Sequence, residues 1–418
     1  MGEDRPILVI IGGGAAGFFA AITAAEASPA ATVHLFDRSR RFLQKVKISG
    51  GGRCNVTHAC FEPEELVRRY PRGARELIGP FHRWQPADTV DWFATRGVPL
   101  KTEADGRMFP TTDSSTTVID CLMQAARQAG VHLHPGIGLD RLVPRDGGFV
   151  LTLTDASTLE ADRVCLAPGS LKSSPLAGEL EQLGHTLEPL APSLFAFNVS
   201  DPRIRGLAGI AVEACRTWIA EGGERQTGPV LITHRGFSGP GILKLSAWEA
   251  RRLQAHGYRF TVVIDWLGGE APEHVAGRLE AQRRDNGATP VKRKPLGSLP
   301  RRLWERLLEA AGIAAGTAWA QLTRDQSDRL VGHLTADTYA VTGKTTNKEE
   351  FVTCGGVSLK EVDFRTFESR IVPGLHFAGE VLDIDGITGG FNFQAAWTGG
   401  HLAGAAMAEA AAAGPGVA

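Results

Sequence analysis

The stretch "PILVIIGGGAAGFFAAITAA" (residues 6–25) decides the fold. It carries no charged side chain over about 20 residues, the length of a membrane-spanning helix, and Arg5 before it would suit a weak signal peptide. The order of its residues favours neither alternative. The branched run "ILVII" (7–11) has the length of a strand buried on both faces, glycines interrupt it, and helix-forming residues follow. The stretch therefore predicts a strand, a tight turn and a helix.

The spacing of the glycines in this turn indicates a nucleotide site. Gly12, Gly14 and Gly17 form G-x-G-x-x-G directly after the strand, and "ATVHLFD" (31–37) predicts a second strand that ends at Asp37. In this pattern the first glycine makes the turn, the second admits a pyrophosphate, and the third lets the helix pack on the strand. The acid that ends the second strand accepts hydrogen bonds from a ribose. We therefore predict a Rossmann-like dinucleotide-binding domain.

A second glycine-rich loop follows at once. "QKVKISGGGRCNVTH" (44–58) combines cationic side chains with a run of unhindered backbone amides, which is typical of an anion-binding loop. The first turn already serves the adenosine end of a dinucleotide, so the second loop should lie farther along the same cofactor. FAD offers such a second region at its flavin end. A flexible surface turn is the alternative, and it would not need this combination of residues.

The end of the chain carries a third motif. "LHFAGE" (375–380) predicts a short strand that ends at Gly379 and Glu380, and "DGITGGFNFQ" (385–394) opens a helix of small residues. Bare amides at a helix N-terminus stabilise negative charge, such as a reduced flavin carries. We expect Glu380 to bind the ribityl hydroxyls of the cofactor.

The motifs together give the expected cofactor-binding residues. These are Gly12, Gly14, Ala15, Ala16, Gly17, Asp37 and Arg38 around the first turn; Lys45, Ser49, Gly50, Gly51, Arg53, Cys54, Asn55 and Thr57 in the second loop; Ala167 and Gly169 in "LAPGS" (166–170); and Gly379, Glu380, Asp385, Gly389, Gly390, Phe391 and Asn392 near the end.

Three segments of the chain resemble a known family. "SGGGRCNVTH" (49–58), "LITHRGFSGPGILKLS" (231–246) and the segment 354–400 are similar to the BaiN/HI0933-like NAD(P)/FAD-dependent oxidoreductases. The resemblance implies a bound FAD, a Rossmann-like core and an inserted β-rich domain with a helical subdomain. Members of the family resemble bile-acid enone reductases and amine-oxidising enzymes. This chain differs in having Asp37 where the family usually has Glu and Phe391 where Tyr is common. It also has "LAPGS" (166–170) in place of the usual Ala-Thr-Gly turn, and Pro168 has no backbone donor.

The pattern along the chain predicts the fold class and the domains. We expect an α/β fold, with the FAD-binding domain formed by residues 1–187 and 345–418. The inserted β-rich domain should comprise 188–268 and 336–344, and the helical subdomain 269–335.

Composition excludes several classes of protein. The 45 basic and 46 acidic residues nearly cancel, which gives no global field for nucleic acid or an acidic membrane. The basic stretch "VKRKPLGSLPRR" (291–302) has no interleaved aromatic residue, so we interpret it as a solvated linker. Six scattered cysteines suit a reducing compartment, hence the cytoplasm, and no second ligand cluster completes a zinc site with Cys54, His58 and Cys60.

The sequence therefore predicts an FAD-dependent oxidoreductase that acts on a small organic substrate. NAD(P)H would visit the flavin transiently, because no second nucleotide motif follows a strand. An oxidase of small amines that uses O₂ is one alternative, and an RNA-associated or tRNA-modifying flavoprotein is another. His234 is a weak candidate for a catalytic proton relay, since histidine titrates near neutral pH. The sequence does not indicate an oligomeric state.

Overall fold

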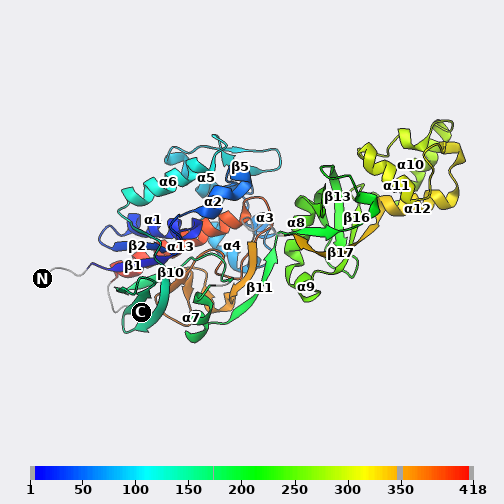
Figure 1. Ribbon diagram of the computed structural model, residues 1–418. Helices are drawn as coiled ribbons and strands as arrows, with labels where there is room; N and C mark the ends of the chain where they lie inside the picture. Colours follow the sequence, from blue (N-terminus) through cyan, green and yellow to red (C-terminus); the bar gives the residue numbers. More distant parts are fainter. Residues whose placement is uncertain (1–4, 173, 346–351, 414–418) are drawn as a thin grey trace. The chain divides into compact units, whose positions relative to one another are not determined.

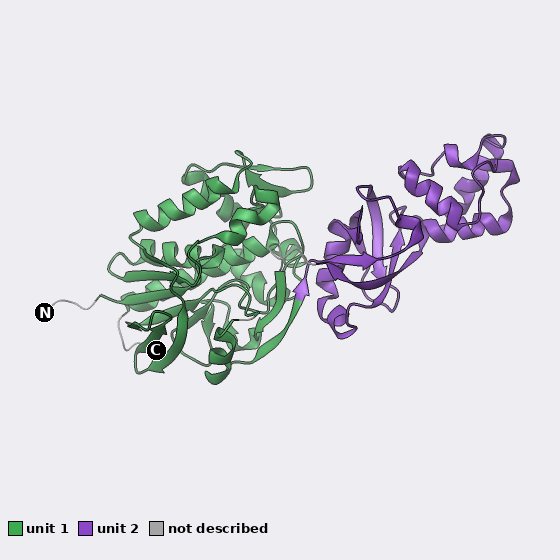
Figure 2. Ribbon diagram, in the orientation of Figure 1, with its two compact units in different colours: residues 1–191, 352–418 green, residues 192–351 purple. Residues whose placement is uncertain are grey.

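The chain divides into two compact units, and the second is inserted into the first (Figure 1; Figure 2). The computed structural model describes residues 5–172, 174–345 and 352–413. The first unit comprises residues 1–191 and 352–418, and the second comprises residues 192–351. Within the described residues, none of the helices combines the length and apolar character needed to cross a bilayer.

A seven-stranded sheet forms the centre of the first unit. Its strands, in spatial order, are β19 (Val362–Asp363), β20 (Glu368–Ser369), β21 (Leu375–Phe377), β10 (Arg163–Leu166), β1 (Ile7–Ile11), β2 (Thr32–Asp37) and β6 (His132–Pro135). The five strands from β21 to β6 are parallel, so their carboxyl ends lie at one edge of the sheet. Leu8, Val9 and Ile10 are fully buried, as expected for a strand covered on both faces.

Helices α1 (Ala15–Ala27) and α13 (Phe391–Ala412) pack closely against each other (Figure 1). Glycines on α13 make this approach possible. A Cβ at Gly400 would lie 2.4 Å from the carbonyl oxygen of Ala16, and one at Gly404 would lie 2.3 Å from that of Ala20. The small-residue helix predicted near the end of the chain is thus the central packing partner of the helix that follows β1.

Further elements surround this core. The helices are α2 (Gln44–Ile48), α3 (Pro63–Val67), α4 (Ala74–Arg83), α5 (Pro86–Thr95), α6 (Ser115–Gln128) and α7 (Leu176–Gln182). One small sheet contains β3 (Thr57–His58), β5 (Arg107–Pro110) and β4 (Leu100–Thr102), and a second contains β7 (Leu139–Arg145), β8 (Gly148–Leu153) and β9 (Thr158–Ala161). Strands β11 (Leu187–Ser193) and β18 (Val352–Val357) form a pair.

The second unit contains a closed six-stranded barrel. Its strands follow the order β12 (Ala196–Val199), β15 (Gly236–Ser238), β14 (Gln226–Thr233), β13 (Ala211–Ile219), β16 (Phe260–Asp265) and β17 (Asp337–Thr345). Closure leaves no strand edge open for pairing with another chain. The helices of this unit are α8 (Pro240–Trp248), α9 (Ala250–Ala255), α10 (Pro272–Asp285), α11 (Arg301–Ala310) and α12 (Arg324–Thr335).

One hydrophobic core runs through this second unit. It joins barrel residues such as Phe197 and Phe237 to helical residues such as Trp304 and Leu307, all of which are at most 1% exposed. The predicted fold class is therefore confirmed: a Rossmann-like α/β domain with a β-rich insertion and additional helices.

Candidate functional site

The turn between β1 and α1 is held in a conformation that only glycine allows. Gly12 has φ +117°, and a Cβ there would lie 2.1 Å from the carbonyl oxygen of Ala167 at the end of β10. A Cβ at Gly17 would lie 1.8 Å from the carbonyl oxygen of Gly12. By contrast, a Cβ at Gly14 would meet nothing within 4 Å. Two of the three glycines are thus required by the packing of the protein itself, whereas the third faces open space.

Asp37 closes this turn from the end of β2. One carboxylate oxygen accepts a hydrogen bond from the Gly13 amide and the other accepts one from the Ser39 amide, both at 2.6 Å. The side chain therefore fixes the glycine turn as well as standing where a ribose acceptor is expected. Phe42, which the sequence did not indicate, covers the other side of Gly13, where a Cβ would lie 2.1 Å from its ring. Arg38 is exposed, and its side chain lies against Gly138.

The N-terminus of α1 presents unused hydrogen-bond donors. No side chain caps this 13-residue helix, and its first turn contains no acidic residue. Among the described residues, the amides of Gly14, Ala15 and Ala16 find no acceptor. An uncapped helix N-terminus with open space beside it is suited to a phosphate group.

The second glycine loop owes its composition to its backbone. Gly50, Gly51 and Gly52 have φ of +57°, +68° and +85°, and a Cβ at Gly51 or Gly52 would meet nothing within 4 Å. A left-handed backbone conformation at three successive positions costs free energy for any residue other than glycine. Cys54 follows with φ +61°, and Ser49 donates to the carbonyl oxygen of Val46 at 2.9 Å. The loop is thus a tight coil whose glycine side faces open space.

Arg53 ties this loop to the neighbouring small sheet. Its guanidinium lies 2.6 Å from a carboxylate oxygen of Glu103 and 3.5 Å from one of Asp113, and it stacks 3.9 Å above the ring of Phe109. These two carboxylates hold the pKa of Arg53 above its usual value, with Glu103 the stronger influence. No local pattern indicated Glu103 or Asp113, because they lie at least 50 residues farther along the chain. The charge of Arg53 is therefore already paired within the protein.

The second loop lies directly against the N-terminus of α13. Thr57 donates to the side chain of Gln394 at 2.6 Å, across 337 positions of sequence. The Asn55 side-chain amide donates to the carbonyl oxygen of Thr57 and accepts from the amide of Gly390, each at 3.0 Å, in the orientation that satisfies both groups. The rings of His58 and Phe391 stack at 4.6 Å. Two of the predicted motifs thus form one site.

The N-terminus of α13 resembles that of α1 in its unused donors. Gly390 has φ +95°, no side chain caps the helix, and the first turn contains no acid. The amides of Phe391, Asn392 and Phe393 have no acceptor within the part of the chain that is described. The Asn392 side chain holds the preceding loop by bonds of 2.9 Å to both backbone groups of Gly386. Gly389 has φ +130° and completes this loop.

Lys45 and Glu380 meet near the N-terminus of α1, because a Cβ at the adjacent Gly379 would lie 3.0 Å from that of Ala16. The ammonium of Lys45 forms an ion pair with one oxygen of Glu380, and the other oxygen accepts a hydrogen bond from the Thr353 amide at 2.8 Å. Gly379, before Glu380, has φ +78°, and Gly169 lies near the same carboxylate. Residues from the ends of β10 and β21 and from α2 are therefore brought together.

Asp385 has a partner that the sequence did not reveal. Its side chain is fully buried, and both oxygens are bonded to the guanidinium of Arg72. The neighbouring Asp383 accepts from the amide of Gly355 at 2.8 Å. This ion pair fixes the loop before α13 from within, so the carboxylate of Asp385 shapes the site through the backbone.

Cys54 lies in the loop but is not a reactive thiol. Burial raises its pKa to about 12, so the thiolate that attacks or binds metals is negligible at neutral pH. No three of the histidine, cysteine and acidic side chains in the described segments gather in a way that could hold a metal.

His234 and Arg235 lie exposed in the turn between β14 and β15 of the second unit.

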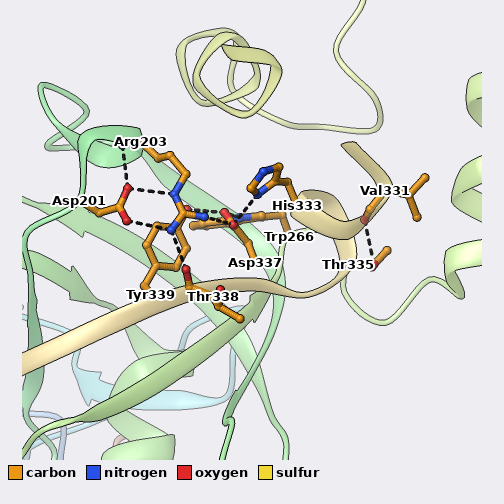
Figure 3. Close-up of polar contacts among 9 residues, drawn as sticks. All are labelled: Asp201, Arg203, Trp266, Val331, His333, Thr335, Asp337, Thr338 and Tyr339. Carbon is orange, nitrogen blue, oxygen red and sulfur yellow. Dashed lines mark hydrogen bonds and ion pairs between the residues drawn. The ribbon is translucent and has the colours of Figure 1, made fainter. Parts of the chain in front are cut away.

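A larger polar cluster of the second unit surrounds Asp337 (Figure 3). Its buried carboxylate accepts from His333 at 2.8 Å and Trp266 at 3.2 Å, and is also bonded to Arg203 and Tyr339. Each oxygen of Asp337 thus has at least two partners, so we interpret the cluster as structural. The sequence "HLTADTY" (333–339) contains it, but its spacing matched no known motif.

The cradle formed by the two helix N-termini, the glycine loop and Asp37 fits a dinucleotide. A Cβ at Gly14 would occupy the space beside the α1 amides, and the Gly51 position is likewise open. Donors without acceptors at two separate helix ends suit the two polar regions of a long cofactor such as FAD.

Comparison with known proteins identifies the family of the chain. The HI0933-like protein Rossmann domain family matches residues 6–406. A 3-dehydro-bile acid delta(4,6)-reductase of Clostridium scindens is 30% identical, over 96% of this chain and 98% of its own length. A ribosomal RNA dihydrouridine synthase of Escherichia coli is 31% identical, over 94% and 96%.

Solved structures share the fold at lower identity. A 3-ketosteroid-delta4-(5alpha)-dehydrogenase from Rhodococcus jostii has a TM-score of 0.51 and 15% identity, with 98% of each chain covered. A 3-ketosteroid delta1-dehydrogenase from Sterolibacterium denitrificans has a TM-score of 0.52 and 11% identity, over 97% of this chain and 99% of the other. The resemblance inferred from the sequence motifs is confirmed: the chain belongs to the HI0933-like family, and it is an FAD-dependent oxidoreductase.

Proposed function

We propose that the protein reduces a carbon–carbon double bond conjugated to a carbonyl group, with bound FAD as hydride carrier and NAD(P)H as transient reductant. Two relatives of nearly equal similarity support this class of reaction. A delta(4,6)-reductase of a 3-dehydro-bile acid and a synthase of dihydrouridine both act, by their names, on such a bond. In the steroid the double bond is conjugated to the 3-oxo group, and in uracil the C5–C6 double bond is conjugated to the C4 carbonyl.

The observation that carries the proposal is the pair of uncapped helix N-termini joined by the second glycine loop. We assign the α1 amides and Asp37 to the adenosine diphosphate half of FAD. Lys45 and Glu380 would contact the chain that links its two halves. The α13 amides would stabilise negative charge on the flavin, where the dipole of a 22-residue helix is favourable. When bound, FAD would supply hydride transfer between the nicotinamide and the substrate.

The net reaction is balanced by one hydride and one proton. NAD(P)H loses the hydride and becomes NAD(P)⁺, the β-carbon of the conjugated bond gains it, and the α-carbon gains a proton from a donor. The carbonyl withdraws electrons, which makes the β-carbon the acceptor.

Anaerobic stopped-flow mixing of the FAD-loaded protein with NADH or NADPH tests the proposal. We expect rapid bleaching of the flavin absorbance, followed by recovery when a 4-en-3-one steroid is added. Recovery that needs only O₂, after bleaching by a small amine, would establish the amine oxidase instead. No bleaching by either nicotinamide would exclude NAD(P)H as the reductant.

Uridine in RNA is the second candidate substrate, because the Escherichia coli relative is as similar as the bile-acid reductase. Incubation of unmodified ribosomal RNA with the protein, FAD and NADPH should then form dihydrouridine, detectable by mass spectrometry of the nucleosides. A protein that reduces the steroid enone but forms no dihydrouridine acts on small molecules, and the reverse result assigns RNA.

We also propose a cytoplasmic location. None of the six cysteines, all of which lie in the described segments, forms a disulfide, and five of them are buried. Free cysteines are typical of proteins in a reducing compartment.

A further inference from the structure

A groove on the first unit lies outside the cradle described above. It encloses about 710 Å³ between α4 and the segment 359–370 that carries β19 and β20. That volume falls within the usual range of small-molecule sites, about 300–1,000 Å³. Its lining residues are Arg75, Glu76, Gly79, Pro80, Arg83, Leu359, Lys360, Val362, Asp363, Phe364, Arg365 and Arg370. None of them is among the expected cofactor-binding residues.

The charge of the groove is strongly positive. Five of its side chains are cationic and two are acidic, which leaves an excess of three positive charges. Asp363 is shared by Arg365 at 2.6 Å and Arg370 at 3.9 Å. Arg83 donates to the backbone carbonyl of Arg365, which links the two walls of the groove.

Three of the cations, Arg75, Arg83 and Lys360, have no acidic partner among the described residues. Arg75 and Lys360 are exposed and form no ion pair with any described residue. Like charges gathered in a concave surface raise the local concentration of anions. This distribution therefore favours a ligand that carries at least two negative charges.

The floor of the groove is apolar and aromatic. Pro80, Leu359 and Val362 contribute to it, and the half-buried ring of Phe364 packs edge-on against Phe367 at 5.1 Å. Gly79 lies in the lining, and a Cβ there would meet nothing within 4 Å. A cationic rim with an aromatic ring in reach combines what a phosphate and a base each require.

We propose that this groove binds a nucleotide through its phosphate. Arg75, Arg83 and Lys360 hold the phosphate oxygens, and the ring of Phe364 receives the base. The phosphate belongs either to a free nucleotide or to a nucleotide within RNA, because both present the same chemistry. The site is independent of the reaction proposed above.

The test uses the FAD-loaded protein, in which FAD occupies the dinucleotide cradle. Binding of a fluorescent ADP is followed by anisotropy at two salt concentrations, with adenosine, inorganic pyrophosphate and a short oligouridylate as competitors. We expect saturable binding that weakens with salt, and displacement by pyrophosphate but not by adenosine at the same concentration. Displacement by the oligouridylate identifies RNA as the source of the phosphate, and its failure identifies a free nucleotide.

Two kinds of variant test the charge of the groove and its open volume separately. Arg75→Gln combined with Lys360→Gln should weaken ADP binding about ten-fold or more and flatten its salt dependence. Gly79→Leu fills the groove without a change of charge and improves helix propensity, so binding should be lost while the melting temperature is kept. Arg127→Gln is the matched control, because Arg127 is an exposed arginine of α6 outside the groove. Absence of ADP binding to the wild-type protein, or wild-type affinity in the double variant, would overturn the proposal.

Discussion

The helix N-termini of the first unit and the Asp337 cluster of the second differ in whether their polar groups have hydrogen-bond partners. At α1 and α13 the first backbone donors are held in place but find no acceptor in the parts of the chain that the structure describes. Around Asp337 a buried carboxylate has four side-chain partners (Figure 3). A polar group without a partner costs stability unless water or a ligand satisfies it, whereas a satisfied cluster fixes one packing. The difference teaches that polarity marks a binding site only where hydrogen-bonding capacity is left over.

The largest expected effect comes from breaking the saturated cluster. Asp337→Ala removes one of the two carboxylates paired with Arg203 and leaves the buried donors of Trp266 and Tyr339 without their acceptor, which costs about 3–5 kcal/mol for a broken buried network. Calorimetry should show a lower melting temperature, and bound FAD should be retained at low temperature because no cradle residue is changed. Asp105→Ala, an exposed acid paired with Arg107, is the control and should have little effect. A loss below about 1 kcal/mol would show that the cluster does not fix the packing.

The second prediction tests whether the backbone amides at the N-terminus of α1 bind the pyrophosphate of FAD. A Cβ at Gly14 would meet no atom of the protein within 4 Å, so Gly14→Ala should leave the stability of the FAD-free protein nearly unchanged. If the pyrophosphate occupies that space, overpacking should weaken FAD by about 1–3 kcal/mol. Equilibrium dialysis measures the affinity. Gly12→Ala, whose Cβ would overlap Ala167, should instead destabilise the protein without any ligand. Unchanged FAD affinity in Gly14→Ala would place the cofactor elsewhere.

The third effect is acid sensitivity of the first unit. Burial is the main cause that lowers the pKa of His401 to about 4, where its ring stacks 3.8 Å from Trp84. The unfolded chain therefore binds the proton more tightly than the folded chain. The resulting stability is fully present above about pH 6.5 and is lost as pH falls toward 4, by about 1–2 kcal/mol after allowance for partial exposure.

Chemical denaturation between pH 4 and 7 checks this dependence, with His401→Phe as the comparison. Phenylalanine keeps the stacking on Trp84 but cannot be protonated, so the slope of stability against pH should be smaller in the variant. Equal slopes in both proteins would assign the acid sensitivity to other groups, such as His34, whose pKa burial likewise lowers to about 4.

The smallest effect concerns Arg53, which belongs to the cradle but resembles the Asp337 cluster in having its charge paired. Arg53→Met should weaken FAD binding only about two- to five-fold, because the ion pairs that it loses are partly exposed. If Arg53 acts by holding the loop, Glu103→Gln should reproduce the effect. FAD fluorescence at two ionic strengths distinguishes the roles. A large loss in Arg53→Met with none in Glu103→Gln would mean that the guanidinium contacts the cofactor.

Local features of the site could be read from the sequence. The strand, turn and helix of residues 7–27 follow from a branched run, a glycine pattern and helix-forming residues, all within one short segment. The glycine loop at 50–52 could be recognised as special, although its reason is the left-handed backbone as much as a close approach by a ligand. Asp385 stays a predicted cofactor-binding residue, and the sequence did not indicate its bond to Arg72.

The sequence by itself determined the Rossmann-like unit and the position of its nucleotide turn, because those depend on periodicity and on the backbone freedom of glycine over a few residues. Only the tertiary structure decided that Thr57 bonds to Gln394 and that Arg53 forms an ion pair with Glu103. It also decided that the cations of α4 line one groove with those of residues 359–370. Each of these contacts joins residues far apart in the chain. Their geometry depends on how whole elements pack, and no local pattern of residues encodes which distant side chain becomes the partner.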